Sequence, residues 1–330
     1  MSMKRSLGDL YQHLPEGRLQ TILTSEDLPW KRILNWIGVS IGILFLGFTA
    51  LLVWRSRDTL VAVLRTAHYE YFLGVFGLYS LSIAWVALGW HLVMRHLRAG
   101  SSLLVDLKAY VYTLAARRLP GKLWYIAGRA ALSRQLGISA RISALSSGIE
   151  VVLSIVSGLI VGTPALLMQT GGARFAVVLV ILAELVGLAV LHPRVLRRLL
   201  GLLGHQLEPG SLAFSRVLSW LGAYTLMWIC GGLMTYAVIA AIHPVGTSEI
   251  PRIISLWALT GVISLAGFLL PSNLGLSEVA LSSLLSSVIP LSIAVATALL
   301  VRILTTLFDV MWSSLLLWDR SGLLGRHNPE

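Results

Sequence analysis

Residues 33–54 form the first of several apolar runs that are about as long as a bilayer is thick. A helix needs about 20 apolar residues to cross the hydrocarbon core. With 56% hydrophobic and only 12% charged residues, the chain also has too few polar side chains to cover a soluble globule. We therefore expect an all-α, polytopic membrane protein with seven or eight transmembrane helices. Further runs follow at residues 72–94, 142–168, 175–191, 217–242, 253–270 and 294–318.

Polar ends flank this apolar region. In residues 1–32, leucines recur at helical spacing, which predicts short interfacial helices in a cytoplasmic or interfacial tail. The first apolar run begins late and is 22 residues long, so we expect a membrane anchor rather than a cleaved signal peptide. Residues 33–318 then form a single transmembrane domain, and residues 319–330 form a short polar tail.

The net charge of +11 comes from lysines and arginines that lie between apolar runs. Anionic lipid is therefore a better partner than nucleic acid. Residues 95–141 hold nine basic side chains and residues 193–216 hold four, which places both segments in the cytoplasm by the positive-inside rule. Arg55, Arg57 and Arg65 would lie on the opposite side if both early runs cross the membrane, in conflict with that rule.

The most basic segment contains a helix break. Pro120 lacks a backbone donor and Gly121 has little helix preference, so a helix that begins near Leu103 should stop near Leu119 and restart after the break. Lys122, Arg129 and the nearby Arg118 would surround the positive end of the restarted helix, with Lys122 and Arg129 about 20° apart on one face. This arrangement indicates an anion site. The alternative is an ordinary positive-inside loop after a terminated membrane helix.

A second break of the same kind lies near the C-terminus. Residues 268–278 interrupt an apolar run with proline, small polar residues and glycine. About twenty residues after each break, a further helix begins. Paired interruptions in two halves are typical of transporter sites near the middle of the membrane. We therefore predict two re-entrant segments in a weak pseudo-repeat, with candidate site residues in the second break at Pro271, Asn273, Gly275 and Glu278.

Four ionisable residues lie inside apolar runs: Glu150, Glu184, Arg302 and Asp309. Each costs about 2.5–3.5 kcal/mol on insertion scales unless it faces protein or water. Two of them belong to polar stripes, because their helical neighbours at the same angle are also polar. We expect the stripes to face each other or a shared cavity. The alternative is that Glu150 and Arg302 pair simply to join two helices. The stripes are Ser143, Ser147, Glu150 and Ser154, and Arg302, Thr306, Asp309 and Ser313.

Catalytic motifs are missing from the sequence. Cys230 is the only cysteine, and no His-Glu-x-x-His, Walker or Gly-x-Ser-x-Gly motif occurs. His91, His192 and His243 lie at the ends of apolar runs, as interfacial residues do. We expect no enzyme activity, no cofactor and no metal.

The two breaks resemble the signatures of a known family. Residues 119–122, 128–129 and 137–139, followed by Glu150, resemble the first signature of the lysylphosphatidylglycerol synthase transmembrane-region family, also called flippase-like domain proteins. Residues 271–278 and 294–302 resemble the second. The resemblance covers residues 72–318. The second motif in that family commonly reads Pro-Gly-Gly-Leu-Gly-Val-Arg-Glu and the first often has a glycine within it, so this chain departs from the pattern at Ser272, Asn273, Ser277 and Trp124.

The family includes the flippase half of lysylphosphatidylglycerol synthases and membrane regions attached to polyprenyl-phosphate glycosyltransferases. This chain resembles the membrane half, so the resemblance does not imply lipid aminoacylation. It implies an inner-membrane protein that binds and translocates a phosphate-bearing lipid, such as a phospholipid or a polyprenyl-phosphate-linked lipid. The alternatives are a subunit or enzyme that presents polyprenyl-phosphate to a separate glycosyltransferase, and a non-transporting assembly factor. The expected lipid-binding residues are Arg118, Pro120, Gly121, Lys122, Arg129, Glu150, Pro271, Asn273, Gly275, Glu278, Arg302 and Asp309.

Overall fold

The computed structural model describes most of the chain between the two tails. The described residues all fall in one compact unit that spans Phe45–Glu330. The predicted tails, residues 1–32 and 319–330, and most of the first apolar run lie outside the described residues. The described residues are 47, 51, 54–55, 57–97, 102–114, 123–135, 139–168, 174–205, 212–266 and 275–318.

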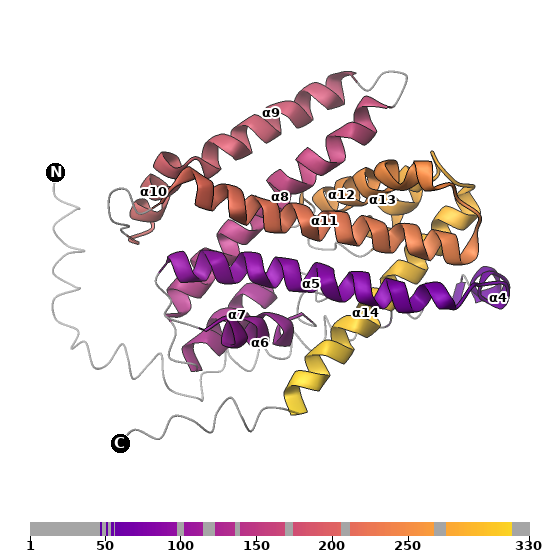
Figure 1. Cartoon of the computed structure of the whole chain (residues 1–330), viewed down its shortest axis with the longest axis horizontal. Coiled ribbons are helices and arrows are strands. Elements are labelled where there is room, and N and C mark those ends of the chain that lie inside the picture. The colour runs from indigo at the N-terminus through magenta and orange to yellow at the C-terminus, as the bar shows by residue number, and fades with distance from the viewer. Residues whose placement is uncertain are drawn as a thin grey trace, which may run out of the picture. The chain divides into compact units, whose positions relative to one another are not determined.

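The described residues form helices and connecting turns, with no strand among them (Figure 1). In chain order the helices are α4 (Arg57–Arg65), α5 (Glu70–His96), α6 (Leu103–Tyr112), α7 (Leu123–Gln135), α8 (Ala140–Leu167), α9 (Arg174–Leu191), α10 (Pro193–Leu202), α11 (Phe214–Ile242), the 3-10 turn η2 (Thr247–Glu249), α12 (Ile250–Ala266), α13 (Leu276–Leu285) and α14 (Leu291–Trp318).

Within the described part of the chain, four helices are long and apolar enough to cross a membrane: α5, α8, α11 and α14. The pair α9 and α10 adds a fifth if it is counted as one span bent by 69°. These spans confirm the prediction of an all-α, polytopic membrane protein. The described residues supply four or five of the seven or eight predicted crossings.

Helices α5 and α11 form a long antiparallel pair, side by side in Figure 1. At one end the amide of His68 donates to the carbonyl of Ala241, and at the other Arg216 lies 3.3 Å from His96. A Cβ atom at Gly89 would lie 2.7 Å from the ring of Tyr224, so the glycine allows the close approach. Because α5 and α11 contact each other from end to end, they form a pair against which the shorter helices pack.

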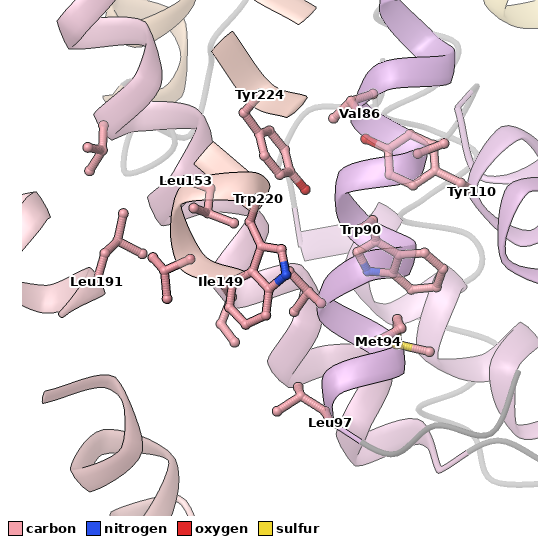
Figure 2. Close-up of a cluster of buried hydrophobic side chains, with 14 of the residues drawn as sticks. Val86, Trp90, Met94, Leu97, Tyr110, Ile149, Leu153, Leu191, Trp220 and Tyr224 are labelled. Atoms are coloured by element: carbon pink, nitrogen blue, oxygen red, sulfur yellow. The ribbon is translucent and has the colours of Figure 1, made fainter. Parts of the chain in front are cut away.

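Two hydrophobic clusters form the core. The first joins α5, α6, α8 and α11 around Trp90, Tyr110 and Tyr224 (Figure 2). The second joins α11, α12, α13 and α14 around Met234 and Leu285. Cys230, in the middle of α11, is also buried.

The helices beside the two predicted breaks are short. Helices α6 and α13 have 10 residues each, which is about 15 Å or half of the ~30 Å hydrocarbon core. Helix α13 begins directly after Gly275, whose φ of 85° is left-handed and cannot continue a helix. This agrees with a break in the second half. Residues 115–122 and 267–274, at the centres of the breaks, lie outside the described residues.

The first break begins earlier than we expected. Helix α6 ends at Tyr112 rather than near Leu119. The hydroxyl of Thr113, the residue that follows the helix, donates to the carbonyls of Ala109 and Tyr110 at 3.2 and 2.9 Å. The backbone amides of Thr113 and Leu114 donate to the carbonyls of Tyr110 and Val111, three residues back, at 3.2 and 3.1 Å, so α6 ends in a tightened turn before Pro120 is reached.

Candidate functional site

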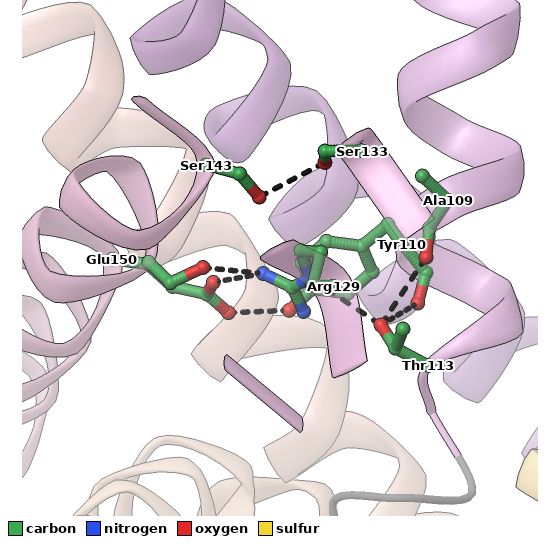
Figure 3. Close-up of polar contacts among 8 residues, drawn as sticks. Ala109, Tyr110, Thr113, Arg129, Ser133, Ser143 and Glu150 are labelled. Atoms are coloured by element: carbon green, nitrogen blue, oxygen red, sulfur yellow. Dashed lines mark hydrogen bonds and ion pairs between the residues drawn. The ribbon is translucent and has the colours of Figure 1, made fainter. Parts of the chain in front are cut away.

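Arg129 is the central residue of the first polar site. It lies on α7, and its side chain has 0% exposure. Its Nη1 atom donates to Oε2 of Glu150 at 2.5 Å, and its Nε atom donates to the hydroxyl of Thr113 at 3.3 Å (Figure 3). The anion beside the guanidinium is thus Glu150, and lipid contact by Arg129 stays a prediction. The guanidinium is enclosed by protein groups that already satisfy its charge.

Two aromatic rings complete the enclosure of Arg129. The guanidinium carbon lies 4.1 Å from the ring centroid of Tyr110 and 4.8 Å from that of Trp90. Cation–π contacts of this kind are worth about 2 kcal/mol or more when they are desolvated. The Tyr110 hydroxyl also donates to Oε1 of Glu150 at 2.6 Å. Each oxygen of the carboxylate thus has a donor, as a buried charge requires.

The polar stripe on α8 explains why α7 packs there. Ser133 and Ser143 are linked by a 3.0 Å hydrogen bond between their hydroxyls, and Ser147 accepts from Arg129 at 3.4 Å. Ser143, Ser147 and Glu150 are all buried, which confirms that they share one buried face. The stripe therefore contacts α6 and α7, and its polar groups form hydrogen bonds with polar side chains of those two helices.

A second charged pair lies in the other half of the chain. Nη1 of Arg302 on α14 lies 2.9 Å from Oε1 of Glu278 on α13. Glu278 lies in the first turn of α13, where the helix dipole favours a negative charge. The side chains of Arg302 and Glu278 retain 17% and 11% exposure, against 0% and 3% for Arg129 and Glu150. The second pair is therefore the less enclosed of the two.

The rest of the α14 stripe contacts α5 and α6. The hydroxyl of Tyr79 donates to Asp309, and Ser313 donates to the carbonyl of Val111 at 3.1 Å. One turn from Asp309, the indole of Trp312 donates to Ser80 at 3.1 Å. The three contacts tie α14 to the two helices that precede the first break.

Glu150 and Arg302 do not pair with each other, so the alternative that such a pair joins two helices is wrong. That the two stripes face each other or a shared cavity stays a prediction. Glu150 pairs with Arg129, and Arg302 pairs with Glu278. Helix α6 contacts both stripes, through Tyr110 on one side and the carbonyl of Val111 on the other. Each long helix therefore pairs with the short helix that precedes it in sequence rather than with the long helix of the other half.

In both halves an ion pair joins a short helix to the long helix that follows it, but the positions of the two charges are exchanged. In the first half the arginine is on the short helix, α7, and the carboxylate is on the long helix, α8. In the second half the carboxylate is on the short helix, α13, and the arginine is on the long helix, α14. The weak repeat in the sequence thus has a counterpart in the structure.

Several residues of the site were not among those expected from the sequence. Trp90, Tyr110 and Tyr79 supply the rings and hydroxyls described above. His91, expected at an interface, is instead buried between helices, and its Nδ1 lies 2.6 Å from Oδ2 of Asp106. The signal that could have found this pair is Asp106, an acid that interrupts an apolar run.

Half of the expected lipid-binding residues lie within the described part of the chain. Gly275 begins α13 and Asp309 lies on the α14 stripe, so both flank the Glu278–Arg302 pair. Glu184 has a separate place, where it accepts from the hydroxyl of Thr163 between α8 and α9. The expected residues that lie outside the described residues are Arg118, Pro120, Gly121, Lys122, Pro271 and Asn273.

Among the described residues, no group of three or more histidine, cysteine or carboxylate side chains could hold a metal ion. The long apolar helices, the short helices at two breaks and the ion pairs between helices define a multi-pass α-helical membrane protein. The family described as Lysylphosphatidylglycerol synthase TM region matches residues 35–313, which is most of the chain. The chain therefore belongs to the lysylphosphatidylglycerol synthase transmembrane-region family, as the two motifs predicted. No curated protein matches the sequence.

Proposed function

We propose that this protein binds and translocates a phosphate-bearing lipid, a phospholipid or a polyprenyl-phosphate-linked lipid, in the inner membrane of the cell. Membership of the family supports a role in lipid synthesis or flipping. The observation that carries the proposal is the partly exposed Glu278–Arg302 pair beside a broken helix. A guanidinium in this setting can exchange a carboxylate for a phosphate, because both anions accept from its planar N–H groups.

In the proposed mechanism the lipid phosphate displaces Glu278 from Arg302. The carboxylate released stays in the first turn of α13, where the helix dipole stabilises it. Asp309 follows Arg302 by two helical turns, about 10 Å along α14, and is buried beneath Tyr79, so the proposed path continues past it once the Tyr79–Asp309 hydrogen bond opens. The lipid chains remain in the hydrocarbon. Neither step makes or breaks a covalent bond, so we propose transport rather than enzyme activity.

In this proposal the Arg129–Glu150 pair has a structural role. Arg129 and Glu150 hold α6 and α7 against α8, and α6 in turn contacts α14 through Val111 and Ser313. The first half thereby fixes one wall of the path, while the second half binds the headgroup. The residues around Pro120 and Pro271, outside the described residues, complete the two breaks as lipid contacts in this proposal.

A leaflet-resolved assay tests the proposal. The protein is reconstituted in vesicles that contain phosphatidylglycerol with a fluorescent headgroup label, and dithionite is added to destroy the label in the outer leaflet. Wild-type protein should lower the fraction of label that is protected, and Arg302→Gln should restore protection to the level of protein-free vesicles. Arg252→Gln is the matched control, because Arg252 also pairs with a glutamate, Glu249, but at a partly exposed helix start.

The result separates transport from lipid presentation. If wild-type vesicles protect the label as protein-free vesicles do, although the protein retains phosphatidylglycerol in native mass spectrometry, translocation is overturned. Lipid presentation to a separate glycosyltransferase would then replace it. If Arg302→Gln translocates lipid as well as Arg252→Gln does, Arg302 is not the headgroup contact.

A further inference from the structure

An apolar pocket lies apart from both ion pairs, between α8 and the bend that joins α9 to α10. Its volume is about 510 Å³, within the usual range for small-molecule sites. Among the described residues, Arg141 is the one charged residue that lines it. The rest of the lining is apolar and includes Gly148 and Val152 from α8 and Leu199 and Leu200 from α10.

Helix α10 forms one wall of this pocket, and the chain turns sharply at both ends of the helix. His192 caps the start of α10 and Pro193 occupies its first turn, where a missing N–H is tolerated. At the other end Gly204, with a φ of 74°, donates to Gly201, and the next amide donates to the carbonyl of Leu200. These two bonds form a Schellman motif, which ends the helix sharply.

Helix α10 has the two faces of a helix that lies in a membrane interface. Leu196 and Leu200 are buried toward the pocket, whereas Arg194 and Arg198 are exposed. Such basic amphipathic helices bind the surface of anionic membranes. The pocket thus opens beside a cluster of positive charge at one boundary of the bilayer.

Arg141 marks the polar end of the pocket. Its Nη2 atom donates to the carbonyl of Leu203, the last residue of α10's cap. A guanidinium has five N–H donors, so this bond fixes its position and leaves donors for an anion. From Arg141 to Val152 the α8 wall extends about 16 Å, close to one half of the ~30 Å hydrocarbon core.

We propose that this pocket binds one acyl chain of an anionic glycerophospholipid, with the lipid phosphate beside Arg141 and the α10 arginines. The apolar lining contacts the acyl chain, and the length of the α8 wall matches the thickness of one leaflet. The positive charge of Arg141 and the α10 arginines complements the phosphate. The site is separate from the Glu278–Arg302 pair, so it holds a resident lipid whether or not that pair carries a transported one.

Photocrosslinking tests the site directly. The probe is a phosphatidylglycerol with a diazirine in the middle of one acyl chain, added to vesicles that contain the purified protein. Crosslinked peptides identified by mass spectrometry should map to α8 near Gly148 and to α10 near Leu199. The variant Gly148→Leu fills the pocket, and a Cβ at this glycine meets no atom within 4 Å. It should reduce these crosslinks at least tenfold without loss of folding.

The matched control is Gly222→Leu. Gly222 is the ninth residue of α11 as Gly148 is of α8, and a Cβ there also meets no atom within 4 Å, but it does not line the pocket. Its crosslinks should equal those of the wild type. Crosslinks that persist in Gly148→Leu, or that fall only on the outer face of α9, would overturn the site. Equal crosslinking by a phosphatidylcholine probe with the same chain would overturn the choice of an anionic headgroup.

Discussion

A fully buried guanidinium is stable only while its counter-charge stays beside it. Removing one member of a buried ion pair usually costs about 3–5 kcal/mol, because the other member is left unpaired. For Arg129→Gln we therefore expect a loss of about that size, and a similar loss for Glu150→Gln. The double variant should recover part of the loss, since no unpaired charge remains. Thermal unfolding in detergent, arranged as a double-mutant cycle, measures the coupling.

The exposed pair Glu249–Arg252 is the control for this cycle. Its atoms lie 3.8 Å apart and both side chains are about one third exposed, so its coupling should be about 0–1 kcal/mol. Strictly additive effects at Arg129 and Glu150 would contradict the pairing described for α7 and α8.

The sequence shows that these charged residues lie within apolar helices more readily than it shows which residues they pair with. Glu150, Arg302 and Asp309 stand out because each interrupts an apolar run, and all three do make polar contacts. Spacing along one helix shows which residues share a face. It does not show which helix covers that face, so Glu150 could not be assigned to Arg129, nor Arg302 to Glu278.

At the scale of helices, hydropathy predicts the long elements well and their ends less well. The apolar runs at residues 72–94 and 142–168 correspond to α5 and α8. The second break, predicted from its proline and glycine, also has its counterpart, since α13 begins directly after Gly275. The early end of α6 escaped prediction because the backbone bonding tightens at Thr113 and Leu114, a change that proline and glycine positions do not show.

The left-handed backbone at Gly275 leads to a prediction about α13. A side chain at a φ of 85° is strained, so Gly275→Ala should destabilise the protein by about 1 kcal/mol or more. Gly222→Ala should instead stabilise it by up to about 1 kcal/mol, because this residue is helical and a Cβ has open space. Melting temperatures of the two variants measure the difference. Equal shifts would mean that the start of α13 is not held in this conformation.

At the scale of the whole molecule, the basic residues gather unevenly at the two ends of the long helices. His96, Arg216 and Arg141 lie at the ends that α10 also marks. At the other end of α5 and α11, the amide of His68 bonds to Ala241, close in sequence to α4 with Arg57 and Arg65. The conflict with the positive-inside rule therefore persists in the fold. Charge alone predicts α10 in the cytoplasm.

Burial of the lone thiol makes that orientation measurable. Cys230 is enclosed within α11, so the unmodified chain should be silent toward a membrane-impermeant maleimide. Ser248→Cys, at the exposed turn η2, should react in intact cells, whereas Ser215→Cys, at the opposite end of α11, should react only after the membrane is permeabilised. The reverse pattern would invert the topology. The protein is thus a background without a reactive thiol, in which any single cysteine placed on its surface reports the compartment that it faces.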